Sequence, residues 1–400
     1  MSSTRRPPAP SARAGRYVRQ AAGYSAFVPS PLPPDPPIDA SAIFDLLSRA
    51  DIAIGRLDGV GRTLPDPDLF VAMYVRREAV YSSQIEGTQS TLDDVLAFEL
   101  EGHGQRVPLD VEEVVNHVAA MNYGLQRLEE LPLSLRLIRE IHEVLMHDVR
   151  GAERSPGEFR RSQNWIGPAG GTLADAAFVP PAVHEMTEAL GDLEIFLHEE
   201  AIYPPLVHAG LAHAQFETIH PFLDGNGRMG RLLITFLLVH RRVLQRPLLY
   251  LSLYLRRHRA EYYDRLMAVR LDGDWEGWLR FFLRGVAETA EEATGTAEAI
   301  LRLRDAHRDL VRDLGTNALH MLDVLYERPV VNVGAIQQAL AVSWPTANKL
   351  TLAFAQRGLL EEMTGQRRNR VFRYAPYLSL FKDSAAPSDD EPAVRTVGEA

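Results

Sequence analysis

Apolar residues recur at helical spacing over most of the first three hundred positions. The first such stretch begins near Ser41, where Ile43, Leu46 and Leu47 share one face of a helix. Turn and cap residues then divide the pattern, as at Leu64-Pro-Asp-Pro-Asp68. The pattern predicts a mainly α protein. Its further helices are expected at 68–86, 91–100, 110–130, 134–149, 182–199, 204–217, from the loop near 231 to about 243, and at 275–312.

Residues 151–182 interrupt this helical pattern with glycines, prolines and scattered aromatic residues. Residues 164–168 and 177–181 are predicted to form two short strands of a hairpin around Gly170 and Gly171. A surface hairpin beside a helical core serves either as a covering loop or as a docking edge.

The region 316–376 is typical of a separate small module. Helices are expected near 316–327, 332–341 and 345–357, followed by a basic hairpin at 365–374. Three helices and a two-stranded wing are the arrangement of a winged helix-turn-helix domain.

Composition marks the two ends of the chain. Residues 1–40 are rich in arginine, alanine and proline, with six prolines between Pro29 and Pro37, and are expected to run as an extended, disordered arm. The last residues, 381–400, are small and acidic, and are also expected to be disordered. The expected divisions between the ends are 41–110, 111–255, 256–314 and 315–380.

The bulk properties describe an ordinary globular protein. The chain has 400 residues, 46% hydrophobic content and a formal net charge of −10, which argues against coating by nucleic acid except at a local basic patch. It contains no cysteine, so disulfides, cysteine nucleophiles and thiolate metal sites are excluded. No apolar run is long enough to span a bilayer and no secretory signal is recognisable, so a cytoplasmic protein without a membrane partner is expected.

The strongest chemical signal is the stretch from His220 to Arg231, His-Pro-Phe-Leu-Asp-Gly-Asn-Gly-Arg-Met-Gly-Arg, which an apolar run follows at once. Its glycines let backbone N–H groups approach an anion, and a helix start adds the positive end of its dipole. Arg228 and Arg231 are three residues apart, so on a helix they point toward the same ligand. The stretch is therefore predicted to be an anion-binding site with a base and a metal-ligand candidate, His220 and Asp224.

Two tempting motifs are rejected on their context. Residues 225–230 satisfy G-x-G-x-x-G, but a helix precedes them and no βαβ pattern surrounds them, so a dinucleotide fold is not expected. His142 and His147 resemble a zinc-protease motif, but they are five residues apart and do not share a helix face.

At every specified position, the stretch resembles the signature H-x-F-x-[D/E]-G-N-G-R-x-x-R of the Fic (filamentation-induced-by-cAMP) family. Residues 156–160 and 249–252 also look like this family, and the resemblance covers roughly 40–290. It implies a Fic helical domain with a β-hairpin flap, to which the winged helix-turn-helix is appended.

The resemblance implies a protein adenylyltransferase, which transfers AMP from ATP to a hydroxyl of a target protein or of the chain itself. His220 would be the base that deprotonates the hydroxyl, and Asp224 would hold Mg²⁺ against the phosphates. Phe222 would pack the loop onto the core. The implied ATP- and phosphate-binding residues are Gly225, Asn226, Gly227, Arg228, Gly230 and Arg231, with the two arginines as clamps.

Residues 82–87, Ser-Ser-Gln-Ile-Glu-Gly, fit the family's inhibitory motif [S/T]-x-x-x-E-[G/N]. The motif closes a predicted helix, where a carboxylate faces the negative end of the dipole and needs a cationic partner. By resemblance, Glu86, with Ser82 in the same motif, pairs with Arg231 and occupies part of the γ-phosphate site. Removal of AMP from the target by a water that Glu86 orients is a second expectation.

The remaining expectations concern substrates and partners. By resemblance, the hairpin is a flap that holds the target by strand addition, and Tyr254 either lines the adenine pocket or is a core aromatic. The winged helix is a candidate for DNA binding or for docking of a protein partner, and a homodimer stays open. The flap residues are Asn164, Trp165, Ile166, Phe178 and Val179, and the DNA candidates are Asn348, Lys349, Arg367, Arg368 and Arg370.

Two alternatives keep the fold and change the function. In one, the chain is a DNA-binding regulator whose non-catalytic Fic core senses a nucleotide. In the other, the site uses a different nucleotide or transfers another phosphate-linked group.

Overall fold

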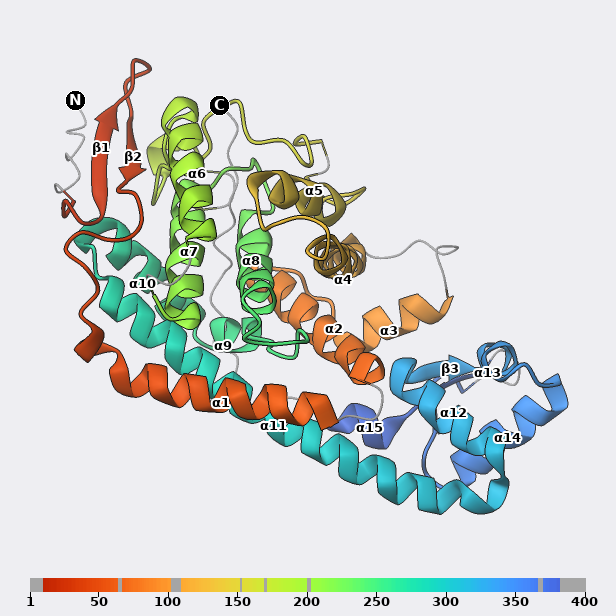
Figure 1. The fold of residues 1–400 in the computed structure, drawn as a ribbon. Helices are drawn as coiled ribbons and strands as arrows, with labels where there is room; N and C mark the ends of the chain where they lie inside the picture. The colour runs from red at the N-terminus through yellow and green to blue at the C-terminus, as the bar shows by residue number, and fades with distance from the viewer. Residues whose placement is uncertain are drawn as a thin grey trace.

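A computed structural model describes residues 10–63, 67–101, 109–151, 153–168, 171–199, 203–365 and 370–381, and the chain is mainly helical (Figure 1). None of the helices in these ranges is both long enough and apolar enough to cross a membrane. The first helices are α1 (Phe44–Thr63), α2 (Pro67–Ile85), α3 (Leu92–Glu101), α4 (Leu109–Arg127), α5 (Leu135–Leu145) and α6 (Val183–His198).

The centre of the fold is the helix pair α7 (Pro205–Ile219) and α8 (Asn226–His240). Residues 206–219 of α7 are all buried, and so are most residues of α8 up to Leu238. Their sequences are apolar around the whole helix, which is the pattern of a helix enclosed by others. The pair packs together and is surrounded by α2, α4, α5 and α6 (Figure 1).

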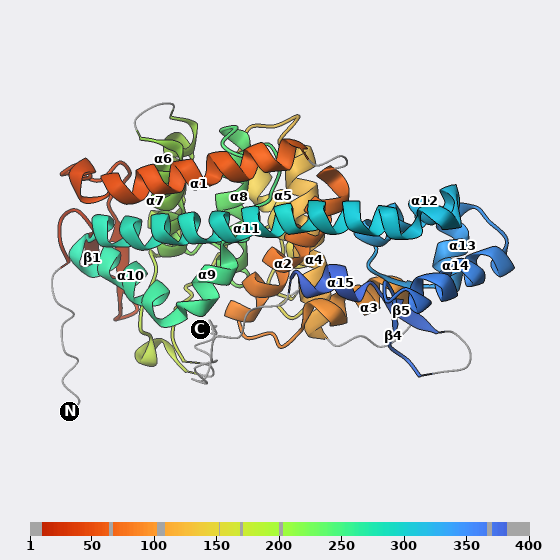
Figure 2. The same cartoon turned by 90° about the horizontal axis from the view of Figure 1, so that it is seen from below.

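A helix of 37 residues, α11 (Trp275–Val311), spans much of the molecule. Asp274 caps its first turn by accepting a hydrogen bond from the N–H of Gly277 (2.9 Å). Helix α1 packs along it, and α9 (Ser252–Arg257) and α10 (Arg259–Asp272) join it to the central pair (Figure 2). Its far end carries the C-terminal elements, so α11 connects the two ends of the fold.

The N-terminal region differs from the expected disordered arm. Strands β1 (Gly15–Arg19) and β2 (Ser25–Pro29) form an antiparallel hairpin in which Tyr17 pairs with Phe27. Phe27 is fully buried against Phe178, and Arg13 forms an ion pair with Glu276 (2.7 Å). The expectation failed because the proline-rich run begins only at Pro29, the last residue of β2, and so does not interrupt the hairpin. Residues 1–9 lie outside the described ranges.

The hairpin expected at 164–181 is smaller than predicted. Its described part contains a single antiparallel bridge, between Ile166 and Phe178, and the short 3-10 helix η2 (Leu173–Asp175) precedes the returning segment. Prolines at 168 and 180 lack an N–H, which limits the length of any ladder here. Gly170 lies outside the described residues, so the expected turn is not described in full.

The C-terminal elements match the predicted helices. They are α12 (Thr316–Glu327), α13 (Val333–Leu340), α14 (Trp344–Gln356) and the short α15 (Ala375–Ser379), with an antiparallel sheet in the order β3-β5-β4. The strands are β3 (Val330–Asn332), β4 (Glu361–Glu362) and β5 (Val371–Arg373).

This C-terminal region shares one apolar core with the rest of the molecule. Its buried apolar residues belong to the same cluster as those of α2, α7 and α8. Phe381 meets the ring of Tyr74 on α2 edge-on, with 5.9 Å between the centroids, and Arg373 lies 3.8 Å from Asp93 of α3. Apolar residues that a sequence pattern assigns to the core of a module at 315–380 therefore also cover α2.

Candidate functional site

The loop between α7 and α8 is fixed at both ends. His220 ends α7 in the left-handed conformation (φ 51°), and Gly225 precedes α8 with φ 76°. The backbone carbonyl of His220 accepts hydrogen bonds from Arg160 Nε (3.0 Å) and Asn164 Nδ2 (3.2 Å). A non-glycine residue in this conformation needs such support from its surroundings.

The His220 imidazole is buried and keeps one nitrogen free. Nδ1 lies 3.4 Å from the carbonyl oxygen of Glu217, while Nε2 has no hydrogen-bond partner within the described part of the chain. Burial, together with the positive charges of Arg270 and Arg160, lowers the pKa of His220 to about 3. The ring is therefore neutral at physiological pH, with a nitrogen that can accept a proton.

The side chain of Asn226 closes the loop. Its Oδ1 accepts from the N–H of Phe222 and its Nδ2 donates to the carbonyl of the same residue, both at 2.8 Å. The amide thus binds the loop backbone at both ends, and its cradling of a phosphate through the second N–H of Nδ2 stays a prediction. The backbone at Gly225 to Gly227 remains the anion-binding part, at a helix start without a side-chain cap.

Asp224 faces the space above this helix start. Its Oδ1 accepts from the N–H of Gly225 (2.6 Å), and burial raises the pKa of its carboxyl group. His142 of α5 holds the backbone here: its Nδ1 accepts from the N–H of Gly157 (2.9 Å), so its Nε2 donates to the Asp224 carbonyl (3.0 Å). The His142 ring also stacks on Phe222, with 3.6 Å between the centroids.

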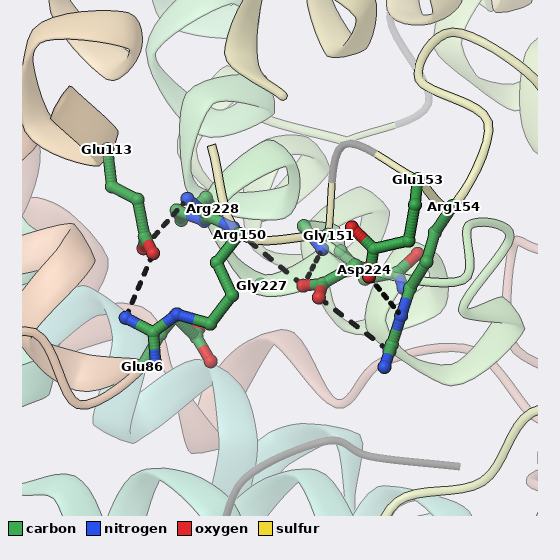
Figure 3. A pocket seen from close by; sticks show the side chains of 11 residues that line it. Glu86, Glu113, Arg150, Gly151, Glu153, Arg154, Asp224, Gly227 and Arg228 are labelled. Atoms are coloured by element: carbon green, nitrogen blue, oxygen red, sulfur yellow. Dashed lines mark hydrogen bonds and ion pairs between the residues drawn. The ribbon is translucent and has the colours of Figure 1, made fainter. Parts of the chain in front are cut away.

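A cavity of about 130 Å³ lies at the start of α8 (Figure 3). Its charged lining residues come from the helix α4, from the loop that follows α5, and from the two motifs that the sequence singled out. Opposite charges alternate around it, which suits a polyphosphate together with a cation. The carboxylates are Glu86, Glu113, Glu153 and Asp224, and the arginines are Arg150, Arg154 and Arg228.

Arg231 is buried and fully engaged by the end of α2. It donates from Nε to Ser82 Oγ (2.8 Å) and from Nη2 to the Ser82 carbonyl (2.8 Å) and to Glu86 Oε1 (2.7 Å). Glu86 follows the last residue of α2, and its side chain is 25% exposed. A Cβ at Gly227 would overlap the Glu86 carboxylate, so the glycine allows the acid to lie on the start of α8.

Arg228 has a different carboxylate partner, which the sequence reasoning missed. Its Nη1 lies 3.2 Å from Glu113 Oε2, and Glu113 Oε1 in turn lies 3.0 Å from Arg150 Nη2 (Figure 3). Glu113 is buried on the face of α4 that also carries Val111 and Val114. A glutamate on the apolar face of an amphipathic helix is a signal that could have identified it, since such groups are rarely buried unpaired.

The expected flap residues surround the loop. Asn164 Nδ2 donates to the carbonyls of His220 and Phe222, and Ile166 and Phe178 form the single bridge. Trp165 is buried. The carbonyl of Val179 accepts from the N–H of Phe27 in β2 (2.9 Å), so the N-terminal hairpin already covers that side of the flap.

Tyr254 lies in the core and does not line the cavity. Its ring packs against Phe281 (5.2 Å between centroids) and His258, and a Cβ at Gly285 would overlap it. Of its two expected roles, the structure supports the core aromatic.

The candidate DNA-binding residues are only partly described. Lys349 is exposed on α14 with Asn348 beside it, whereas Arg367 and Arg368 lie outside the described residues. Arg370 lies 3.7 Å from Glu362. A basic surface made of the five candidates therefore stays a prediction.

Two family models match consecutive parts of the chain. Residues 44–126 match "Fic/DOC family N-terminal" and residues 132–238 match "Fic/DOC family". The second match includes the whole loop and both arginines.

Curated relatives also match part of the chain. A protein adenylyltransferase Fic of Aedes aegypti is 33% identical over 161 residues, which are 40% of this chain and 28% of the relative. One of Culex quinquefasciatus is 32% identical over 211 residues, 51% of this chain and 36% of the relative. The chain thus spans about a third of the length of these relatives.

Among solved structures, a Fic family protein from Desulfovibrio desulfuricans G20 shares the fold, with a TM-score of 0.53 and 22% identity. The superposition covers 83% of this chain and 95% of that protein.

Proposed function

Because the chain belongs to the Fic/DOC family through residues 44–126 and 132–238, we propose that it is a protein adenylyltransferase that uses ATP. The observation that carries the proposal is the neutral, buried His220 with a free Nε2, placed at the loop that opens α8. The relatives named protein adenylyltransferase support the same activity at the level of the family.

In the proposed reaction, His220 Nε2 accepts the proton of a target hydroxyl, whose oxygen then attacks the α-phosphorus of ATP. A bond forms between this oxygen and the α-phosphorus, the bond from that phosphorus to the bridging oxygen breaks, and pyrophosphate leaves. Backbone N–H groups at the start of α8, with Arg228 and Arg231, stabilise the phosphate charge. The His220 proton is released to solvent after the transfer.

The residues present fit a Mg²⁺ ion, which the resemblance implies. Asp224 lines the cavity, and no cluster of three or more metal-binding side chains occurs in the described ranges. Mg²⁺ commonly binds one or two carboxylates together with substrate phosphates, so a single aspartate is sufficient. When bound, the ion would neutralise phosphate charge, and Asp224 would hold it.

Glu86 is proposed to inhibit the reaction. Its ion pair with Arg231 takes a guanidinium that the phosphates need, and its carboxylate lies over Gly227, at the positive end of the α8 dipole. A phosphate that approaches this point would meet a negative charge. The second oxygen of Glu86, Oε2, supports the further proposal that it orients a water for removal of AMP from the target.

Incubation with α-labelled ATP, Mg²⁺ and a cell lysate tests both proposals. Labelling of protein should be weak in wild type and stronger in Glu86→Gly. It should be lost in His220→Ala and in the double variant Glu86→Gly/His220→Ala. Equal background labelling in all four proteins, with ATP still bound, would favour the nucleotide-sensing regulator. To test reversal, purified labelled target is incubated with wild type and Glu86→Gly, and release of AMP by wild type alone supports it.

The C-terminal region is proposed to be a winged helix-turn-helix, supported by α12 to α14 and the sheet β3-β5-β4. DNA binding through it is the weaker proposal, because Arg357, Arg370 and Arg373 each lie within 4 Å of a carboxylate. A salt titration of binding to duplex DNA tests whether the C-terminal region binds DNA. A steep fall with salt indicates phosphate contacts, and negligible binding at low salt removes DNA as a partner.

A further inference from the structure

The two arginines of the loop are held by carboxylates from two different helices. Arg231 binds Glu86 at the end of α2, whereas Arg228 binds Glu113, which lies in the second turn of α4. Moving Glu86 away from Arg231 would therefore leave Arg228 in its ion pair. Both Glu86 and Glu113 line the cavity, and each occupies a guanidinium that a phosphate could bind.

The contacts of Arg228 are incomplete. Its Nη1 makes one contact of 3.2 Å to Glu113, and its Nη2 donates to the sulfur of Met146 at 3.3 Å and lies 3.7 Å from Asp224. Its Nε is buried without a hydrogen-bond partner among the described residues. Sulfur is a weak acceptor, and an unsatisfied buried donor is costly, so this guanidinium would gain from an anion with several oxygens.

Arg150 gives Glu113 a second cation. Its Nη2 lies 3.0 Å from Glu113 Oε1 and 2.9 Å from Asp110 Oδ1. Leaving a buried carboxylate unpaired is strongly destabilising, so Glu113 could not release Arg228 without another partner. Because Arg150 is already in contact, the carboxylate stays neutralised when Arg228 turns toward a ligand (Figure 3).

We propose that Glu113 is a second inhibitory carboxylate of the site. It occupies Arg228 until a polyphosphate takes its place, and it then remains paired with Arg150. This rests on the proposed binding of ATP at the loop. Glu113 holds its arginine less tightly than Glu86 does, because its contact with the guanidinium is longer, 3.2 Å against 2.7 Å. It acts through a different arginine and a different helix, so its effect adds to that of Glu86.

The test measures binding of α,β-methylene-ATP, which cannot be cleaved between its α- and β-phosphates, by calorimetry with Mg²⁺. Glu113→Gln keeps the shape and an acceptor for Arg228 but removes the charge, and it should lower Kd about fivefold or more, the lower range of coupling between sites. Arg150→Gln leaves Glu113 with Arg228 alone and should raise Kd. Glu112→Gln removes the same charge one residue away on α4 and should change Kd little.

The double variant Glu86→Gln/Glu113→Gln should show the sum of the two single effects on the binding free energy. Adenosine, which lacks phosphates, should bind all variants equally. Arg150 is half-exposed, so Arg150→Gln keeps the inference testable if Glu113→Gln does not fold.

Two results would contradict inhibition by Glu113, and a third would contradict the proposed function. Equal Kd values in wild type, Glu113→Gln and Arg150→Gln would show that Glu113 does not inhibit binding, while leaving nucleotide binding intact. Weaker binding by Glu113→Gln would instead mean that Glu113 holds Arg228 in place for the ligand. No binding by any variant, the double variant included, would remove the proposed function itself.

Discussion

At the scale of single residues, Asn226 determines the shape of the loop. It bonds to both the N–H and the carbonyl of Phe222, and both backbone groups are buried with it. Asn226→Ala leaves the buried Phe222 N–H unpaired, while the Phe222 carbonyl keeps its hydrogen bond from Asn164, so the free energy of unfolding should fall by about 1–3 kcal/mol. Denaturant unfolding measures this fall.

Asn226→Asp is the matched control. Its carboxylate still accepts from the Phe222 N–H but cannot donate to the carbonyl, and it brings a negative charge to the start of α8. It should lose stability as well, while nucleotide binding weakens more than in Asn226→Ala. Unchanged stability in Asn226→Ala would contradict the loop-closing role.

His220 should give the stability of the protein a dependence on acid pH. Burial lowers its pKa to about 3 in the folded state, against about 6.5 in the unfolded chain. Between these values the unfolded chain binds a proton that the folded protein does not, so stability falls as pH falls below about 6.5.

Substitution with glutamine isolates this contribution. From pH 7 to pH 5, wild type should lose about 2 kcal/mol more stability than His220→Gln, because 1.36 kcal/mol corresponds to one unit of pKa. Urea unfolding of both proteins at the two pH values measures the difference. A difference near zero would mean that folding does not lower the pKa of the imidazole, and would contradict a buried ring that stays neutral at pH 5.

The sequence could predict the residues of the loop but not all of their roles. Asp224 and Arg228 line the cavity, whereas His220 and Arg231 are not among its lining residues. A left-handed His220 and Gly225 turn the chain between the two helices that carry these four residues. The loop-closing use of Asn226 and the partner of Arg228 depend on side-chain geometry. Spacing within one segment contains no information on that geometry.

At the scale of elements, the N-terminal hairpin supports the flap. Phe27 donates its N–H to the carbonyl of Val179 and packs its ring on Phe178. The guanidinium of Arg270 also lies over the Phe178 ring, 4.2 Å from its centroid. Phe27→Ala removes this packing. The bridge between Ile166 and Phe178 should then open more often, since a single bridge has little stability of its own.

Hydrogen exchange measures this opening. The amides of Ile166 and Phe178 should exchange at least tenfold faster in Phe27→Ala, while Val18→Ala on the neighbouring strand should leave them nearly unchanged. If the flap holds the target, Phe27→Ala should also raise KM for the target and not for ATP. Equal exchange in the two variants would show that the flap is stable without the hairpin.

The elements that the sequence predicted well are those with a long apolar period. Helix α2 was expected at 68–86 and is found at Pro67–Ile85, and α12 was expected and found at 316–327. The hairpin at 15–29 was missed because its strands have only five residues each and a proline-rich stretch follows. Short strands take their stability from distant partners, here Phe178, and a local pattern does not reveal those.

At the scale of the whole molecule, helix α2 lies between the cavity and the C-terminal elements. Its end carries Glu86, and its middle carries Tyr74, on which Phe381 packs. The apolar cluster is continuous from α7 through α2 to α12, and α11 runs alongside both regions (Figure 2). The boundary expected at 315 divides the sequence but not the core.

A continuous core should unfold as one unit. Differential scanning calorimetry of the full chain should give a single transition in which the calorimetric and van't Hoff enthalpies agree. Phe381→Ala leaves a cavity against Tyr74 and Tyr377, and should lower the free energy of unfolding by about 3–5 kcal/mol. The whole transition should shift to lower temperature, because the lost contact joins the two regions.

Leu310→Ala is the surface control: Leu310 is 44% exposed on α11, so its truncation should leave the transition almost unmoved. If Phe381→Ala instead splits off a small early transition and the main one stays in place, the C-terminal region is an independent unit. Glu86 would then be positioned without help from the C-terminal region. A shift of the whole transition, accompanied by stronger labelling from α-labelled ATP, would mean that packing at Phe381 helps to hold α2, and with it Glu86, against Arg231.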